Sequence, residues 1–174
     1  MVHTAGSSGN PHNWELELHR LLPLFGHRNW IVVADAAYPA QSNSGIETVV
    51  ADADHLHVLR KVQDAMAACQ HICVNIYTDL ELGFVEEIDA PGITEYRRQL
   101  DGLLHPSELR QLPHEQIIAK LDQCAQTFRV LIVKTDLMIP YSSVFFELEC
   151  GYWVAEAEQR LRHAMLQGPV PTVS

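Results

Sequence analysis

An imidazole and a carboxylate stand eight residues apart in the most informative stretch of the chain. His27 follows Gly26, and Asp35 comes directly after the apolar run 30–34. A histidine side chain can give or take a proton near neutral pH, and a carboxylate can accept hydrogen bonds from the hydroxyl groups of a ligand. These two residues are therefore candidates for general acid/base chemistry on a small polar molecule.

The run between them predicts a strand that holds the two side chains at fixed positions. Residues 30–34 are continuously apolar, which is typical of a strand buried on both faces of a parallel sheet. A strand of this length spans about 17 Å, so His27 and Asp35 are expected at opposite ends of it. They can share one site if two subunits contribute to it. The structural alternatives are that His27 bonds the last carbonyl groups of the preceding helix and that Asp35 caps a turn.

Other polar residues are predicted near the ends of strands. In open α/β sheets ligands bind outside the carboxyl ends of the strands, and residues 77–79 and 134–136 follow or end two further apolar runs. Tyr141 comes after Pro140, where its hydroxyl can bond a ligand or its ring can simply pack on the sheet edge. His114 begins a predicted helix, where its ring faces either a cleft or solvent.

The segment 52–57 resembles a metal site in composition. It contains Asp52, Asp54, His55 and His57 within six residues, and a metal-dependent hydrolase is the corresponding hypothesis. A helix is predicted to begin at the same place, however, and an aspartate there satisfies free backbone N–H groups and the helix dipole. The spacing matches no common metal motif, so we favour capping and predict no metal site.

Composition and missing motifs exclude several classes. The chain has 174 residues, 47% of them hydrophobic, and a net charge of −10, which argues against binding to nucleic acid. No stretch is long and apolar enough to predict a membrane span or a signal peptide. The four widely spaced cysteines are expected to be reduced thiols in a cytoplasmic protein. Glycine-rich phosphate loops and a serine-hydrolase elbow are absent, and Ala37 stands where a haloacid-dehalogenase-like phosphatase needs a second aspartate.

Helical and strand patterns alternate along the chain. Helices are predicted over residues 14–25, 55–66, 94–104, 113–126 and 153–166. Strands are predicted over residues 30–34, 72–77, 128–133 and 141–149, and residues 46–50 form a strand or lead into a helix. This order predicts an α/β fold with a mostly parallel sheet, helices on both of its faces and an extra helix at the C-terminal end. We expect a single domain over residues 13–167, with a flexible segment 1–12 before it and a loose segment 168–174 after it.

The stretch 26–39 resembles the ribose pyranase / fucose mutarotase family. Members of that family have a helix, Gly-His, an apolar strand and an Asp-Ala-Asn-Phe-Pro-like segment, and here Gly26-His27 leads to Asp35-Ala36-Ala37-Tyr38-Pro39. Residues 46–50 and the ending 130–146 are also similar to the family. The resemblance covers roughly residues 14–152.

The resemblance implies a role for five residues. His27 corresponds to the acid/base histidine and Asp35 to a sugar-binding carboxylate, while Tyr141 corresponds to the tyrosine of the family's Tyr-x-Asn motif. His114 begins the sequence His114-Glu115-Gln116, which matches the His-Glu-Gln motif of ribose-type members. Ser143 stands where the family has asparagine, and a hydroxyl is shorter than an amide and cannot donate and accept hydrogen bonds in the same way.

The activity implied by the resemblance is interconversion of the anomers or ring forms of a free monosaccharide. Such a mutarotase or pyranase is an isomerase that needs no metal, redox cofactor or nucleotide. The resemblance also implies a ring-shaped homo-oligomer with sites between subunits, which agrees with the expected separation of His27 from Asp35. The alternative is a sugar-binding relative without turnover, because Ser143 replaces asparagine.

Overall fold

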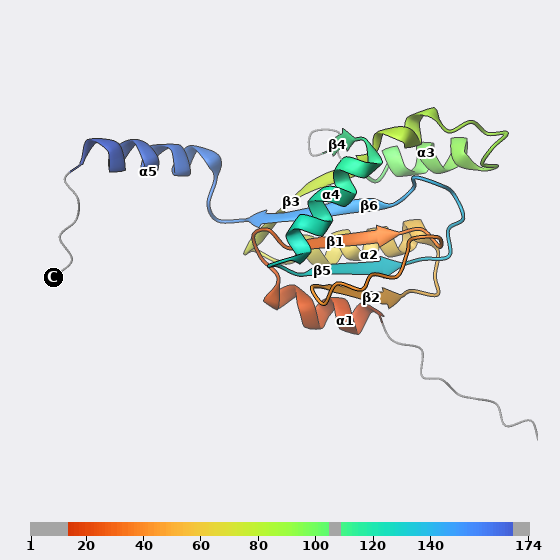
Figure 1. Cartoon of the computed structure of the whole chain (residues 1–174), viewed down its shortest axis with the longest axis horizontal. Helices are drawn as coiled ribbons and strands as arrows, with labels where there is room; N and C mark the ends of the chain where they lie inside the picture. Colours follow the sequence, from red (N-terminus) through yellow and green to blue (C-terminus); the bar gives the residue numbers. More distant parts are fainter. Residues whose placement is uncertain (1–13, 105–108, 169–174) are drawn as a thin grey trace, which may run out of the picture.

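Six strands form one sheet in a computed structural model that describes residues 14–104 and 109–168 (Figure 1). The strands are β1 (Trp30–Ala34), β2 (Ile46–Val50), β3 (Ile72–Asp79), β4 (Leu109–Leu112), β5 (Val130–Lys134) and β6 (Val144–Cys150). The helices are α1 (Trp14–Leu21), α2 (His55–Ala67), α3 (Ile93–Asp101), α4 (His114–Ala125) and α5 (Ala155–Gln167), with short 3₁₀ helices η1 (Leu22–Leu24) and η2 (Leu80–Phe84).

The strand order across the sheet is β2-β5-β1-β6-β3-β4. β6 runs antiparallel to both of its neighbours, β1 and β3, whereas the remaining pairs are parallel. The predicted α/β class with a mostly parallel sheet is therefore confirmed. The antiparallel strand has a consequence for the site, because its first residues lie at the carboxyl ends of β1 and β3 and its last residues lie at their amino ends.

Central strand β1 is buried along its whole length. Its side chains alternate between two apolar clusters, as the twofold repeat of a strand requires. Ile31 and Val33 pack in a cluster with residues of α1, α2 and α3, whereas Trp30 and Val32 pack in a second cluster with residues of α4. Figure 1 shows α2 behind the sheet and α4 in front of it.

Three element predictions were wrong in detail. The first helix does not run to residue 25, because Pro23 lies in η1, where a proline fits the first turn. The last strand does not begin at Tyr141, which has a left-handed φ of 58° and lies in the turn before β6. Strand β4 was missed because it is short, with the four residues Leu-Arg-Gln-Leu, and only partly buried. It is an edge strand that pairs with β3.

The predicted C-terminal helix is present as α5 and extends away from the sheet (Figure 1). None of its residues is buried, although Leu161 and Met165 are apolar. No helix in residues 14–104 and 109–168 combines the length and the apolar character that crossing a membrane requires. The predicted end segment 1–12 and all but the first residue of the predicted end segment 168–174 lie outside the described residues.

Gly45 lies where two backbone segments approach closely, so a substitution there tests the packing. A Cβ atom at this position would lie 2.2 Å from the carbonyl oxygen of Ala125 and 3.0 Å from that of Phe128. We predict that Gly45→Ala lowers the free energy of unfolding by about 1–3 kcal/mol, since backbone atoms cannot yield as a flexible side chain can. Urea denaturation measures the difference. Gly83→Ala is the control, because nothing lies within 4 Å of its Cβ position; equal effects of the two variants would contradict the packing.

Candidate functional site

His27 lies in a tight turn at the amino end of β1. The backbone N–H of Gly26 donates to Asn29 Oδ1 at 2.8 Å, which closes the turn. Arg28 has a left-handed φ of 76°, and its N–H donates to the carbonyl of Leu148 in β6 at 2.8 Å. The turn is thereby tied to the end of the antiparallel strand, so His27 is held at a fixed position although its side chain is half-exposed.

The ring of His27 contacts a carboxylate on one nitrogen and a guanidinium on the other. Its Nδ1 forms a short contact with Glu149 Oε2, and Arg28 Nε donates to its Nε2 at 3.2 Å. Because Nε2 accepts in this arrangement, Nδ1 carries the proton and donates to Glu149. This is the tautomer that a carboxylate next to an acid/base histidine selects. Glu149 was not among the residues predicted from the sequence.

A hollow of about 560 Å³ adjoins His27 between the end of β6 and α4. Its lining includes His27, Glu147, Glu149 and Lys120. The hydroxyl of Tyr77 donates to Glu147 Oε2 at 2.8 Å, which fixes that carboxylate. A cavity of this size can hold a small molecule, and its charged lining suits a ligand with several hydroxyl groups.

Asp35 and Ser143 lie side by side at the opposite edge of the sheet. Ser143 Oγ accepts from the backbone N–H of Asp35 at 3.2 Å and donates to Asp35 Oδ2 at 2.9 Å. Asp35 Oδ1 accepts from the N–H of Ala37 at 2.8 Å, so this residue also makes the turn contact that we gave as its structural alternative. Ser143 is buried, because it comes directly before β6 and next to the end of β1.

His114 and Tyr141 also lie together. The ring centroids are 5.6 Å apart and the ring planes meet at 79°, an edge-to-face contact. His114 is the first residue of α4, and its backbone N–H donates to both carboxylate oxygens of Glu81 at 3.1 and 3.0 Å. A carboxylate at this position stabilises the positive end of the helix dipole.

Asp79, the last residue of β3, ties His114 to the sheet. Its Oδ2 lies 3.1 Å from His114 Nδ1, and its side chain is only 1% exposed. The pKa of Asp79 is raised to about 6, mainly by burial; the interaction with His114 opposes this rise, and the nearby carboxylates of Glu81 and Asp35 add to it. Val144 of β6 pairs with both Val33 of β1 and Thr78 of β3, so the Asp35–Ser143 and His114–Tyr141 pairs belong to one edge of the sheet.

The structure therefore brings four of the five predicted site residues to one edge and leaves His27 at the other. Asp35, Ser143, His114 and Tyr141 surround the carboxyl ends of β1 and β3 and the start of β6. The sequence indicated these strand ends, including residues 77–79. It did not indicate Glu81 or Glu149, since the signal for Glu149 is the antiparallel direction of β6, which no local pattern reveals.

The acidic and histidine-rich segment 52–57 serves the fold. Asp54 Oδ1 accepts from the N–H of His57 at 2.9 Å and caps α2, as the capping interpretation predicted. His55 is buried, with Nδ1 2.9 Å from Thr135 Oγ1. Within the described residues no group of three or more histidine, cysteine, aspartate or glutamate side chains is arranged to hold a metal ion. The metal-hydrolase hypothesis gains no support from these contacts.

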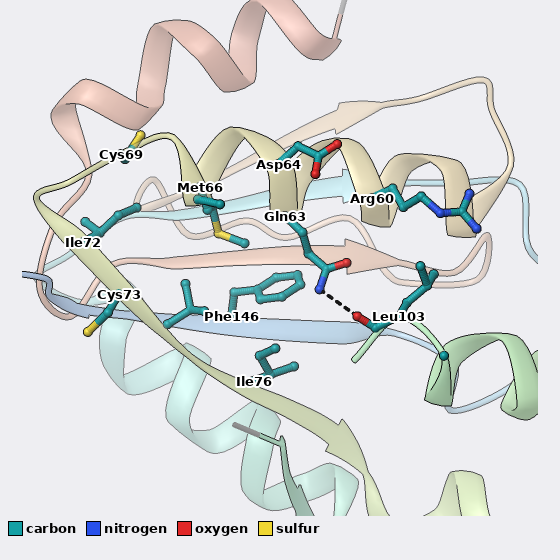
Figure 2. Close-up of a pocket in the computed structure, with 13 residues that line it drawn as sticks. Arg60, Gln63, Asp64, Met66, Cys69, Ile72, Cys73, Ile76, Leu103 and Phe146 are labelled. Atoms are coloured by element: carbon teal, nitrogen blue, oxygen red, sulfur yellow. Dashed lines mark hydrogen bonds between the residues drawn. The ribbon is translucent and has the colours of Figure 1, made fainter. Parts of the chain in front are cut away.

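A second hollow, of about 500 Å³, lies between α2 and strands β3 and β6 (Figure 2). Its floor is apolar, with Ile76 and Phe146, and the Nε2 atom of Gln63 donates to the carbonyl of Leu103 at 3.3 Å across it. None of the five predicted site residues lines it. It is a gap in the helix layer, separate from the two polar clusters.

The chain has an α/β fold with a mostly parallel sheet and one polar cluster at each end of its central strands. A family model described as the RbsD / FucU transport protein family matches residues 13–151. The chain belongs to that family, so the resemblance given above is confirmed. α5 lies beyond the matched residues.

Solved structures with the same fold come from three bacteria. The structure of Bacillus subtilis RbsD complexed with D-ribose is 19% identical, with a TM-score of 0.51, and the match covers 88% of this chain and 100% of that one. A fucose mutarotase from Streptococcus pneumoniae in complex with L-fucose is 22% identical, with a TM-score of 0.53 and coverage of 84% and 99%. FucU from Bifidobacterium longum is 14% identical, with a TM-score of 0.51 and coverage of 77% and 92%. A search of curated proteins found no significant match.

The buried His55 makes stability depend on pH. Thr135 Oγ1 donates to the carbonyl of Ala34 at 2.8 Å and so accepts from His55 Nδ1, while Nε2 has no hydrogen-bond partner among the described residues. Burial lowers the pKa of His55 to about 4. Below pH 6.5 His55 is protonated in the unfolded chain but stays neutral in the folded chain, so the free energy of unfolding falls as the pH falls toward 4.

We predict that the free energy of unfolding falls by about 3 kcal/mol less in His55→Gln than in the unmodified protein when the pH is lowered from 7 to 4. Urea denaturation of both proteins at several pH values measures the difference in slope, which does not depend on the variant's own stability. His57→Gln, at an exposed position on the same helix, is the control. If the two variants lose stability with the same slope as the original protein, His55 is not the group that titrates.

Proposed function

We propose that this protein is a monosaccharide mutarotase or pyranase that interconverts anomers or ring forms of a free sugar by general acid/base catalysis at His27. Two findings support the proposal. The chain belongs to the RbsD / FucU family, and one structural neighbour in the comparison is a fucose mutarotase in complex with L-fucose. The observation that carries it is the half-exposed His27 ring, held by Glu149 and Arg28 beside a polar hollow.

The chemistry requires two proton transfers and no cofactor. When the sugar ring opens, a base takes the proton of the anomeric hydroxyl, the C1–O bond to the ring oxygen breaks, and an acid gives that oxygen a proton. Reclosure reverses these steps with either face of the carbonyl. An imidazole can serve in both directions near neutral pH, and a positioned proton transfer contributes about 10²–10⁴ in rate.

The other predicted residues bind the substrate in this proposal. Asp35 accepts hydrogen bonds from sugar hydroxyls, while Tyr141 contacts the sugar from the turn before β6 and His114 contacts it from the start of α4. Ser143 contributes a hydroxyl beside Asp35. We assign no metal or cofactor to the reaction, and we place the protein in the cytoplasm on the cysteine argument given above.

Because His27 and Asp35 occupy opposite ends of β1, the proposed site is completed between subunits of a homo-oligomeric ring. One subunit supplies His27 with Glu149, and its neighbour supplies the edge with Asp35, Tyr141 and Ser143. The separation along the strand is the argument for this arrangement, since a monosaccharide is far shorter than the strand.

We predict that His27→Ala lowers the protein-dependent rate of sugar anomer exchange by about 10²–10⁴. Magnetisation-exchange NMR on ribose and on fucose measures the rate for each sugar. His19→Ala, an exposed histidine of α1, is the control. Unchanged exchange in His27→Ala would remove His27 from the mechanism.

We predict that mixing His27→Ala with Asp35→Asn, each inactive alone, restores exchange after the subunits are dissociated and reassembled. Random assembly at equal concentrations leaves about a quarter of the shared sites with both residues intact. A mixture that stays inactive although the subunits have exchanged, as shown by mass spectrometry of labelled chains, would place both residues in one subunit's site.

A non-catalytic sugar-binding relative is the alternative. Ser143 favours it, because its hydroxyl is shorter than the family's asparagine amide and already bonds Asp35 both as donor and as acceptor. Saturation-transfer NMR detects binding independently of exchange. Binding of ribose or fucose without any exchange in the unmodified protein would support the alternative over the mutarotase.

A further inference from the structure

The contact between Asp79 and His114 is the most unusual electrostatic feature at the carboxyl edge of the sheet. Asp79 is a buried carboxylate whose Oδ2 lies 3.1 Å from His114 Nδ1. Its other oxygen, Oδ1, is buried without a hydrogen-bond partner among the described residues. A carboxylate in such a place is costly unless it is paired, so the bond to His114 is its principal compensation.

Two carboxylates and an aromatic ring lie around this pair. Glu81 of η2 accepts the backbone N–H of His114, Asp35 approaches from the end of β1, and the ring of Tyr141 meets the His114 ring edge to face. Carboxylates predominate around Asp79, and His114 is the one group that lowers the pKa of Asp79. The surroundings therefore favour a proton that is held between Asp79 and His114.

The bond also decides which nitrogen of His114 can meet a ligand. Asp79 engages Nδ1, so Nδ1 carries the proton and Nε2 remains for another partner. The side chain of His114 is 32% exposed, whereas that of Asp79 is 1% exposed. Only the histidine can touch a substrate, and the carboxylate acts through it, as in other carboxylate–histidine pairs.

We propose that Asp79 is a positioning residue that holds His114 with Nε2 toward the sugar and makes His114 the second proton-transfer group of the reaction. This inference rests on the proposed function. One histidine, as the neutral imidazole, takes the anomeric hydroxyl proton as the C1–O bond to the ring oxygen breaks, and the other, as the imidazolium, gives the proton on its Nε2 to that oxygen and becomes neutral. Each histidine ends the cycle as it began, because reclosure returns both protons.

The proposal predicts that Asp79→Asn lowers kcat for sugar anomer exchange by about 10- to 100-fold while KM changes little. An asparagine keeps the shape but no longer selects the Nδ1–H tautomer with a charge. The rate of the unmodified protein should also fall as Asp79 takes up a proton below about pH 6, and this acid limb should be absent in Asp79→Asn. Asp101→Asn, at an exposed position in α3, is the control.

A titration that needs no activity separates this proposal from the proposed function. Carbon-13 NMR of the Asp79 carboxyl group should show a higher midpoint in His114→Gln than in the unmodified protein, since the variant lacks the histidine that lowers the pKa of Asp79. If the protein exchanges no sugar but the midpoint moves as expected, the proposed mutarotase function is wrong, whereas the interaction between Asp79 and His114 is supported. An unmoved midpoint, or an Asp79→Asn protein with unchanged kcat and pH profile, would overturn the role of Asp79.

Discussion

The pairing of β1 between a parallel and an antiparallel neighbour governs the arrangement of every polar group discussed above. β5 continues the direction of β1, whereas β6 reverses it, so the two ends of β6 serve opposite edges of the sheet. Its start places Ser143 against Asp35, and its end places Glu149 against His27. Because β1 is buried on both faces and hydrogen-bonded to a neighbouring strand on each side, the distance between its two ends is fixed.

The two edges differ in their electrostatics. At the amino end of β1, His27 is half-exposed and lies between Glu149 and Arg28. At the carboxyl end, Asp79 is buried among carboxylates and depends on His114. In the proposed reaction, the half-exposed imidazole of His27 and the imidazole of His114, held by the buried Asp79, would carry out the two proton transfers of ring opening.

Family membership and the sequence departures from the family carry separate information. The matched region, residues 13–151, contains the whole sheet, and the structural neighbours share its fold at identities of 14–22%. At such identities the neighbours show the fold alone. Ser143, Asp79 and His114 are therefore the residues whose roles have to be tested in this chain itself.

The sequence by itself determined the class of the fold, the central strand 30–34 and the positions of His27 and Asp35 at its two ends, because continuous apolar character and turn residues are local signals. It also determined the capping role of Asp54, which depends only on the helix that follows it. Only the tertiary structure decided that Glu149 meets His27 and that Asp79 meets His114, since these contacts join residues 122 and 35 positions apart. The physical reason is that strand order and direction arise from the packing of the whole sheet, on which short-range patterns carry no information.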